Sequence, residues 1–405
     1  MDTSKMRCLE EQNVNQTFAL FTQSEDLKKI ATSFFESMET ALIRNQIVEA
    51  LQDYDLGIVT AVYEIFGGYV NRSFGIVMEK NGTNYEYYVR KYKYGIAKTE
   101  ILLEHSMIDY SKAHGLDITA GLIRTKDGIT FVKKVEGTKE IFFAVYEFLQ
   151  GDDLYTWDNP ALNDAEYASA AEVLATFHNA ARNFNPNGLV RVEPKIMELL
   201  TNLPEKYKTL GQVDIDTKFH RYFKSKLNSI LKVIESSLIP NHILEKMPYS
   251  PCHNDFHAGN LKFANSKVVG IFDFDWSKID HRLSDVTLAL TYLCSSWQDE
   301  QDGVLLIDKC AIFIKSYQRK LLELGGLEPL NAVEIEYLPM MIAAANIYLI
   351  NWDVAAYYAG TNLNEYEYIA YLQHNVRLMH WIENHKTEIA DLAKTAGQAN
   401  REGNI

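Results

Sequence analysis

The chain changes character near Gly151, and this change constrains its fold more than any other feature. Over residues 57–150, short runs rich in Val, Ile, Tyr and Phe are separated by turn dipeptides such as Asn81-Gly82 and Asp127-Gly128. Such runs with Asn-Gly or Asp-Gly between them are typical of antiparallel hairpins. Beyond Gly151, apolar residues recur mainly at helical spacing. The pattern predicts a sheet-rich N-terminal lobe and a helical C-terminal lobe, with a site in the cleft between them.

The same patterns locate individual elements and domains. Residues 1–24 are polar and aperiodic, and a helix is predicted from Glu25 to about Leu51. A second helix, KTEILLEHSMIDYSKAHG, ends at Gly115, and the buried strand IFFAVYEFL precedes Gly151. Later helices are predicted over residues 163–184 (opened by a capping box of Asn163 and Glu166), 216–237, 304–324, 332–358 and 364–393. The predicted domains are 1–52 (arm and helix), 53–150 (sheet-rich lobe) and 151–405 (helical lobe).

Charge and cysteine content exclude several classes of protein. Lys and Arg total 40 against 54 Asp and Glu, a net charge of −14, so a nucleic-acid partner is not expected. The four cysteines show no C-x-x-C pair and are interpreted as reduced thiols. No signal peptide is recognised, and the most apolar stretch, Met340 to Trp352, is too short to span a membrane. We expect a cytoplasmic protein without a membrane partner.

A short non-helical segment, residues 252–276, interrupts the helical lobe. Two apolar strands, 261–263 and 268–272, flank a turn at Asn265-Ser266. A hairpin of this length brings the segment before its first strand close to the segment after its second. The polar side chains at these ends are His253, Asp255, His257, Asn260, Asp273 and Asp275. We therefore expect Asp255, Asn260 and Asp273 to converge.

The composition of this cluster indicates its chemistry. Clustered carboxylates are unfavourable unless a cation or a proton compensates their charge, and a set of Asn and Asp oxygens suits Mg²⁺. The spacing H-x-D-x-x-x-x-N, followed by a strand that ends in D-F-D, matches the arrangement used for phosphoryl transfer. That arrangement contains a base Asp, a metal-binding Asn and a metal-binding Asp.

On these residues, His253–Asn260 and Ile271–Asp275, the chain resembles the aminoglycoside phosphotransferase and choline kinase family. The resemblance implies an α+β, bilobal protein-kinase-like fold, with one key helix in the antiparallel-sheet lobe and a larger, mainly helical C-lobe. It also implies that Asp255 is the catalytic base, that Asn260 and Asp273 bind Mg²⁺, and that Asp275 supports the metal site. His253 would brace the loop, and Asn254 stands where the family usually has Gly.

The resemblance also assigns residues to ATP. A glycine-containing turn, residues 66–73, would cover the phosphates through Gly68, Asn71, Arg72 and Ser73. Arg90 stands at the position of the family's phosphate-binding Lys, with Lys91 one residue out of phase. Glu104 would pair with that cation, and Glu100 is the second choice. The backbone of the hinge strand, at Glu147 and Leu149, would contact adenine.

The predicted activity is transfer of the γ-phosphoryl group of ATP to a hydroxyl of a small molecule. Amino alcohols, aminoglycosides, hydroxy amino acids and sugars all stay open as acceptors. Aromatic and acidic residues in the helical lobe would suit a cationic acceptor, unless Trp157 and Trp352 are core packing. These residues are Asp152, Asp153, Tyr155, Trp157, Asp158, Trp352 and Asp353.

Three alternatives explain fewer of the residues. A transition-metal hydrolase would use His253, Asp255 and His257 but leaves Asn260 and the D-F-D unexplained. A nucleotide-binding pseudokinase is supported only by Arg90 in place of Lys. A protein kinase would require an A-P-E-type segment after the D-F-D, and none follows.

His178 and Asp285 match positions that have structural roles in the resembling family.

Overall fold

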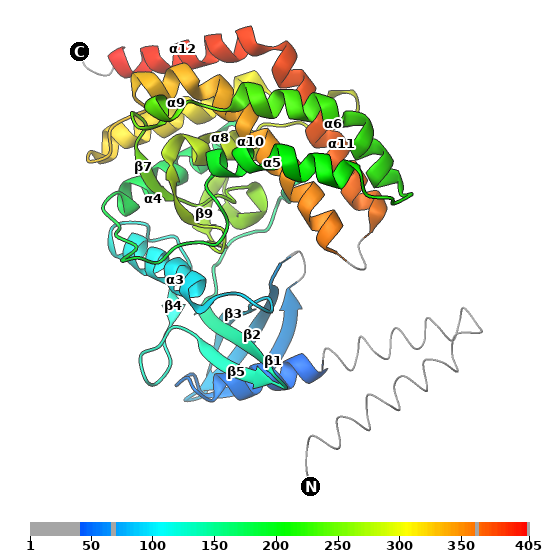
Figure 1. Ribbon diagram of the computed structural model, residues 1–405. Helices are drawn as coiled ribbons and strands as arrows, with labels where there is room; N and C mark the ends of the chain where they lie inside the picture. Colours follow the sequence, from blue (N-terminus) through cyan, green and yellow to red (C-terminus); the bar gives the residue numbers. More distant parts are fainter. Residues whose placement is uncertain (1–40, 66–69, 361–363, 403–405) are drawn as a thin grey trace. The chain divides into compact units, whose positions relative to one another are not determined.

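The structure is a computed structural model that describes residues 41–65, 70–360 and 364–402, with side chains as far as residue 394. The chain divides into two compact units (Figure 1). The first comprises the chain up to Gly95 together with Ile123–Phe148, and the second comprises Ile96–Leu122 and the chain from Leu149 onward.

The first unit is a six-stranded sheet that packs one face against a helix over residues 41–51. Apolar residues of this helix, such as Ile43 and Ile47, form a core with Ile76, Val89 and Phe143 of the sheet. The strands follow the order β1 (Ile58–Ile65), β2 (Arg72–Lys80), β3 (Thr83–Lys91), β6 (Lys139–Glu147) and β4 (Leu122–Ile123), and β5 (Val132–Glu136) also pairs with β6. Of the predicted helix 25–51, residues 25–40 lie outside the described residues, as does the arm 1–24.

One of the two predicted hairpins is confirmed. β2 and β3 pair antiparallel around Asn81 and Gly82, whose φ values of 55° and 77° fit a tight two-residue turn. The hairpin predicted around Asp127-Gly128 is wrong, because β4 and β5 each pair with β6 and not with each other. A turn dipeptide fixes a local reversal of the chain, but it does not decide which strand its flanks will join.

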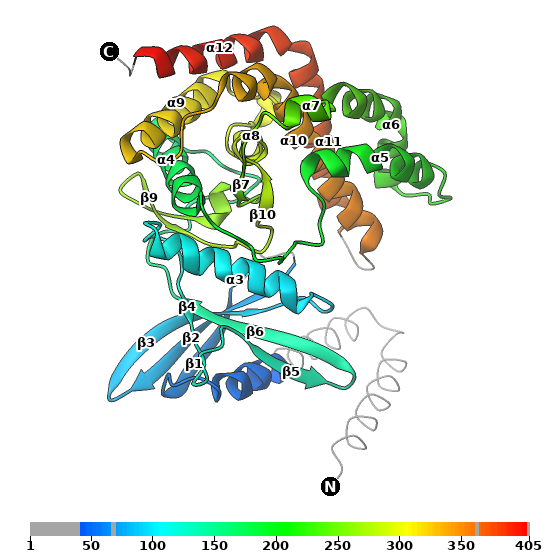
Figure 2. The ribbon, with the colours of Figure 1, turned by 60° about the vertical axis from the view of Figure 1, so that its left-hand side comes forward.

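The second unit is mainly helical (Figure 2). Its helices are α3 (Lys98–Ala113), α4 (Asp164–Ala181), α5 (Ile196–Gly211), α6 (Lys218–Ser237), α7 (Asn241–Leu244), α8 (Arg282–Leu293), α9 (Ile307–Leu324), α10 (Ala332–Ala359), α11 (Glu365–Asn384) and α12 (Lys386–Glu402). The helix predicted over 364–393 is two helices, with His385 between them. The capping box at Asn163 and Glu166 is confirmed.

Besides the four-residue helix α7, two helices of this unit escaped the sequence analysis. α5 contains Pro204, which usually marks the end of a helix. α8 is buried along almost its whole length, so it lacks the alternation of apolar and polar faces by which a helix is recognised. α3 packs against α4 and belongs to this unit, whereas the domain boundary near Gly151 stays a prediction.

α10 is the apolar centre of the second unit. By length and composition alone it could cross a membrane, but two thirds of its most apolar window is buried inside the structure. It packs against α5, α6, α8, α11 and α12. This is the position of a buried core helix.

Two short hairpin-like ribbons support the predicted catalytic segment. β7 (Tyr249–Cys252) pairs with β10 (Lys278–His281), and β8 (Leu261–Ala264) pairs with β9 (Lys267–Ile271). Asn265 and Ser266 form the turn between β8 and β9, both at positive φ, so the predicted hairpin is confirmed. The loop from residue 253 to residue 260 is thereby held at both ends.

Candidate active site

The predicted base and the predicted metal-binding Asn lie side by side in the loop between β7 and β8. The amide nitrogen of Asn260 donates to the backbone oxygen of Asp255 at 2.8 Å and to its Oδ2 at 3.0 Å. Asn260 is buried at the end of a short 3₁₀ helix, Ala258–Asn260, which His257 caps by accepting the N–H of Gly259. Because both amide hydrogens point to Asp255, the Asn260 Oδ1 is the atom that can bind a cation.

The β8–β9 ribbon places Asp273 next to this pair. Leu261 pairs with Ile271, and the N–H of Phe272 donates to the backbone oxygen of Asn260 at 3.2 Å. Asp273 follows directly, at a φ of 65°, and Asp275 is buried two residues later. The backbone thus brings Asp255, Asn260 and Asp273 into one neighbourhood, while their chemical roles stay a prediction.

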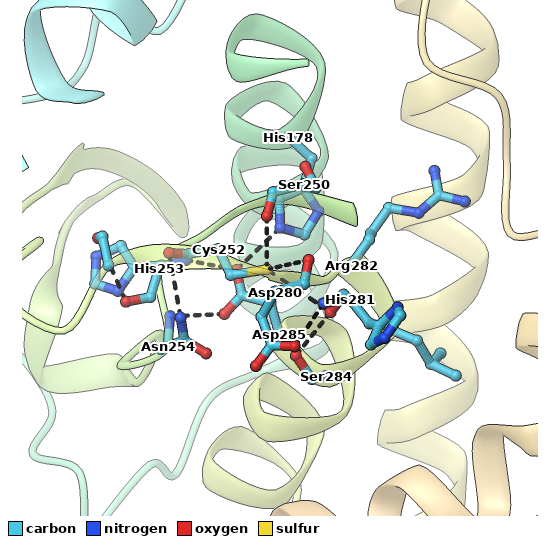
Figure 3. Close-up of polar contacts among 12 residues, drawn as sticks. His178, Ser250, Cys252, His253, Asn254, Asp280, His281, Arg282, Ser284 and Asp285 are labelled. Carbon is cyan, nitrogen blue, oxygen red and sulfur yellow. Dashed lines mark hydrogen bonds and ion pairs between the residues drawn. The ribbon is translucent and has the colours of Figure 1, made fainter. Parts of the chain in front are cut away.

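Asp285 of α8 holds the start of the loop (Figure 3). Its carboxylate accepts the backbone N–H of His253 at 2.7 Å and that of Asn254 at 2.8 Å. His178 contacts the same carboxylate at 2.9 Å, and its other ring nitrogen contacts the hydroxyl of Tyr317 at 2.7 Å. Burial alone would raise the pKa of Asp285, but the hydrogen bond and charge of His178 and His253 overcome it, so the pKa is lowered. Asp285 is therefore a buried anion that fixes two backbone groups of the loop.

This contact explains the substitution at Asn254. Asn254 has a φ of 60°, in the left-handed region that favours Gly. Asn is among the residues that enter this region most readily, so it can replace the Gly usual in the resembling family. The positive φ turns two successive N–H groups toward the same carboxylate, as in an anion-binding nest.

The structure does not assemble the alternative transition-metal set. Nε2 of His253 lies 3.1 Å from the backbone oxygen of Phe272, and complete burial lowers the pKa of His253. Among the described residues, the group whose ligand atoms lie within 4.8 Å of one another is His178, Cys252 and Asp285. Because the carboxylate of Asp285 is already hydrogen-bonded, that group is explained without a metal.

One residue beside the predicted base, Asp255, was missed by the sequence analysis. The hydroxyl of Tyr292 donates to Oδ1 of Asp255 at 3.2 Å. Its ring lies 5.2 Å from that of His257, whose Nε2 is 3.5 Å from Oδ2 of Asp255. Tyr292 could not be identified because it belongs to α8, a helix that lacks a polar face.

Apart from the half-buried Asp158, the predicted acceptor residues separate into two groups. Asp152, Asp153 and Tyr155 have structural partners: Asp152 pairs with Phe263 through the backbone, Asp153 with Lys262 at 2.5 Å, and Tyr155 with Glu166 at 2.7 Å. Asp353 is buried and accepts from Asn375 at 2.8 Å, and burial raises its pKa well above the usual value. The side chains of Asp153, Tyr155 and Asp353 are therefore poor candidates for contact with an acceptor, whereas Asp152 is engaged through its backbone alone.

The second group is an aromatic cluster formed by Trp157, Trp297, Trp352 and Tyr371. The ring centroid of Trp157 is 4.4 Å from that of Tyr371, 5.5 Å from that of Trp297 and 6.0 Å from that of Trp352. The three tryptophans are only half-buried, which is unusual for core packing. The backbone nitrogen of Trp157 would lie 3.4 Å from a Cβ at Gly259, so the cluster adjoins the loop of Asp255.

In the first unit, Arg90 and Lys91 lie on opposite faces of the sheet. Nζ of Lys91 donates to Gln46 of the helix over residues 41–51, at 3.0 Å. The guanidinium of Arg90 is buried on the other face, 5.6–5.9 Å from the ring centroids of Tyr88, Tyr92 and Tyr146. The alternation of side chains along β3 therefore leaves Arg90 as the candidate for a phosphate contact.

The other predicted nucleotide residues have identified partners or lie outside the described part. Arg72 makes two 2.9 Å hydrogen bonds to Glu64, Ser73 shares a 2.5 Å bond with the hydroxyl of Tyr88, and Asn71 accepts the N–H of Lys93 at 3.0 Å. Gly68 lies outside the described residues. Glu147 ends β6 opposite Tyr87, and Leu149 lies beside Gly270 of β9.

On α3, the two candidate glutamates differ. Glu100 accepts the N–H of Val192 at 3.2 Å and lies 3.3 Å from Nε of Arg191, so it anchors the segment before α5. Glu104 is buried one turn later. Glu100 is thus engaged as an anchor, and the pairing of Glu104 with a phosphate-binding cation stays a prediction.

Comparison with known proteins agrees with this geometry. The chain matches the phosphotransferase enzyme family over residues 63–320. It is 22% identical over 312 residues to the homoserine kinase of Ralstonia nicotianae, which covers 76% of this chain and 84% of that relative. The structure of a microcompartment-associated aminopropanol kinase aligns with a TM-score of 0.63 at 14% identity, covering 85% of this chain and 98% of the other. A spectinomycin phosphotransferase in complex with ADP and spectinomycin aligns with a TM-score of 0.54 at 17% identity, covering 87% and 98%.

The fold is the protein-kinase-like α+β fold that the resemblance implied, with an antiparallel sheet in the N-terminal region and helices in the C-terminal region. The chain belongs to the phosphotransferase enzyme family. It is a small-molecule kinase that acts on a hydroxyl group, and neither the hydrolase nor the pseudokinase alternative is supported.

Proposed function

We propose that this enzyme transfers the γ-phosphoryl group of ATP to the hydroxyl of a small compound that carries a cationic amine, with Asp255 as the base. The observation that supports this most is the contact between Asp255 and Asn260 beside Asp273. Residues 53–150 would bind the nucleotide, and residues 151–405 would carry out catalysis and bind the acceptor. The enzyme would act in the cytoplasm.

The donor set fits Mg²⁺. Oδ1 of Asn260 and the carboxylate of Asp273 are hard oxygen donors, and Asp275 adds a second carboxylate nearby. When bound together with ATP, the ion would neutralise charge on the phosphates and align the group to be transferred. Few protein ligands are required, because water and phosphate oxygens complete the shell of this ion.

The chain's own residues supply the rest of the reaction. Asp255 accepts the proton of the acceptor hydroxyl as the new P–O bond forms and the bond to the ADP leaving group breaks. Arg90, paired with Glu104, would contact the ATP phosphates. Asn71, Arg72 and Ser73 would contribute through the backbone of the Gly68 turn, since their side chains have other partners. The hinge backbone at Glu147 and Leu149 would contact adenine.

The acceptor class rests on two observations. Homoserine and aminopropanol, named in two of the similar proteins, each carry both a hydroxyl and an amine. In this chain, the half-buried aromatic cluster around Trp157 adjoins the loop of Asp255. Aromatic faces attract cations by about 0.5–2 kcal/mol, which suits an ammonium group.

The test is an ATP-consumption screen with Mg²⁺ in which each amino alcohol or hydroxy amino acid is paired with its amine-free analogue. We expect turnover with the amine and a phosphate ester detected by mass spectrometry. Trp157→Leu should raise KM for the acceptor and leave KM for ATP unchanged, with the half-buried Trp381→Leu as the matched control. Equal turnover of both members of each pair would contradict the acceptor class.

A further inference from the structure

Both carboxylate oxygens of the proposed base are held by other side chains. Oδ1 of Asp255 accepts from the hydroxyl of Tyr292 at 3.2 Å, and Oδ2 accepts from the amide of Asn260 at 3.0 Å. With one donor on each oxygen, neither torsion of the Asp255 side chain can change without the loss of a hydrogen bond. The carboxylate is therefore oriented before any acceptor binds.

The helix that carries Tyr292 also carries the residue that holds the loop's backbone. Asp285 and Tyr292 are two turns apart on α8, and residues at this spacing share one face of a helix. Asp285 binds the N–H groups of His253 and Asn254, while Tyr292 binds the side chain of Asp255. One helical face thus fixes both the backbone and the side chain of the catalytic loop.

The hydroxyl of Tyr292 is suited to donate at any working pH. Burial, and then the negative charge of Asp255, raise its pKa well above the usual value. The negative charges of Asp353 and Glu193, which belong to the same unit, raise the pKa of Tyr292 further. Glu193 in turn accepts from the hydroxyl of Tyr348 at 2.8 Å and pairs with Lys278 at 3.2 Å. Among the described residues, only Tyr292 has a hydroxyl with a hydrogen bond to Asp255 that the structure records.

We propose that Tyr292 is a positioning residue that orients the base Asp255 for attack by the acceptor hydroxyl. This inference rests on the proposed function, because it requires that Asp255 accept the proton. Tyr292 does not react, and it acts only through Asp255. Its removal should therefore lower the rate of the chemical step and leave nucleotide binding intact.

The test is a double-mutant cycle between Tyr292→Phe and Asp255→Asn, measured as kcat and KM. Tyr292→Phe retains the ring that packs beside His257 and removes only the hydroxyl. A hydrogen bond to a charged group supports a loss of about tenfold in kcat, with KM for ATP unchanged. In the Asp255→Asn background, the same change should cost less than about twofold, since there is no base left to orient.

A matched control comes from Tyr167 of α4, which contacts α8 one residue beyond Tyr292. Tyr167 donates to the backbone oxygen of Leu293 at 3.0 Å, so Tyr167→Phe also removes one buried hydroxyl at this end of the helix. It should lower Tm about as much as Tyr292→Phe and leave kcat within twofold. If Tyr292→Phe does not fold, Tyr292→Leu also removes the donor to Asp255 and takes its place in the cycle.

The outcomes separate the two claims. Fully additive losses, or an unchanged kcat in Tyr292→Phe, would overturn the positioning role while the assignment of Asp255 stands. Wild-type kcat in Asp255→Asn alone would overturn the proposed function itself, whatever Tyr292 does.

Discussion

The two regions predicted to handle phosphate hold their polar side chains in different ways. In the catalytic loop, the partners lie within the same short stretch of chain, as with Asp255 and Asn260, or on the helix that follows, as with Asp285. In the sheet of the first unit, Arg72 and Ser73 contact Glu64 and Tyr88 on neighbouring strands. A motif whose residues contact each other can be interpreted from its spacing alone. A strand residue can be interpreted only once its neighbours are known.

The largest expected effect comes from the predicted metal ligand, Asp273. Asp273→Asn should lower kcat by about 10³-fold or more, because a bound divalent ion stabilises the transition state by several kcal/mol. The same variant should bind Mn²⁺ together with ATP more weakly, measured by titration. Asp153→Asn, on an exposed carboxylate paired with Lys262, is the control and should change kcat by less than twofold. If Asp273→Asn shows the same metal dependence as the wild type, Asp273 is not a metal ligand.

Next in size is loss of the buried carboxylate under the loop. Asp285→Asn leaves fewer acceptor sites for the N–H groups of His253 and Asn254 and for His178, so the free energy of unfolding should fall by about 2–4 kcal/mol. Denaturant unfolding measures this change, and kcat should fall with it. The exposed Asp216, paired with Arg221, is the matched control. Equal stability of Asp285→Asn and Asp216→Asn would show that the loop is held by other contacts.

The sequence alone predicts the catalytic hairpin but not the side chains that pack against it. The spacing of Asp255, Asn260 and Asp273 predicts a compact hairpin, because the distances involved are local and the Asn265-Ser266 turn sets the register. Tyr292 and the four-residue aromatic cluster could not be predicted, since their partners are far apart in the chain and meet only through helix packing. The hairpin predicted at Asp127-Gly128 failed for a different reason, because β5 pairs with the strand that directly follows it, β6, with Glu136 opposite Lys139.

A smaller effect should separate the two faces of β3. Arg90→Lys keeps the charge but loses the planar fork that lies among three tyrosines, so KM for ATP should rise by about three- to tenfold. Lys91→Met, on the face of the helix over residues 41–51, should alter Tm and leave KM for ATP within twofold. If KM for ATP instead rises in Lys91→Met and is unchanged in Arg90→Lys, Lys91 and not Arg90 contacts the phosphates.

The smallest effect concerns the pair of Arg72 and Glu64. This partly exposed pair should contribute about 0.5–1 kcal/mol to stability after screening by solvent. Arg72→Gln should therefore lower Tm slightly and leave KM for ATP within twofold, as should Glu64→Gln. A large rise in KM for ATP in Arg72→Gln, absent from Glu64→Gln, would give the Arg72 side chain a direct role in nucleotide binding.

The central claim is that one loop supplies the base of a phosphoryl transfer to a hydroxyl. The most direct measurement is kcat of Asp255→Asn at saturating ATP, Mg²⁺ and acceptor, together with the affinity of the same variant for ATP. The account predicts a loss of about 10²–10⁴-fold in kcat with an almost unchanged affinity for ATP. Turnover within about tenfold of the wild type would contradict it.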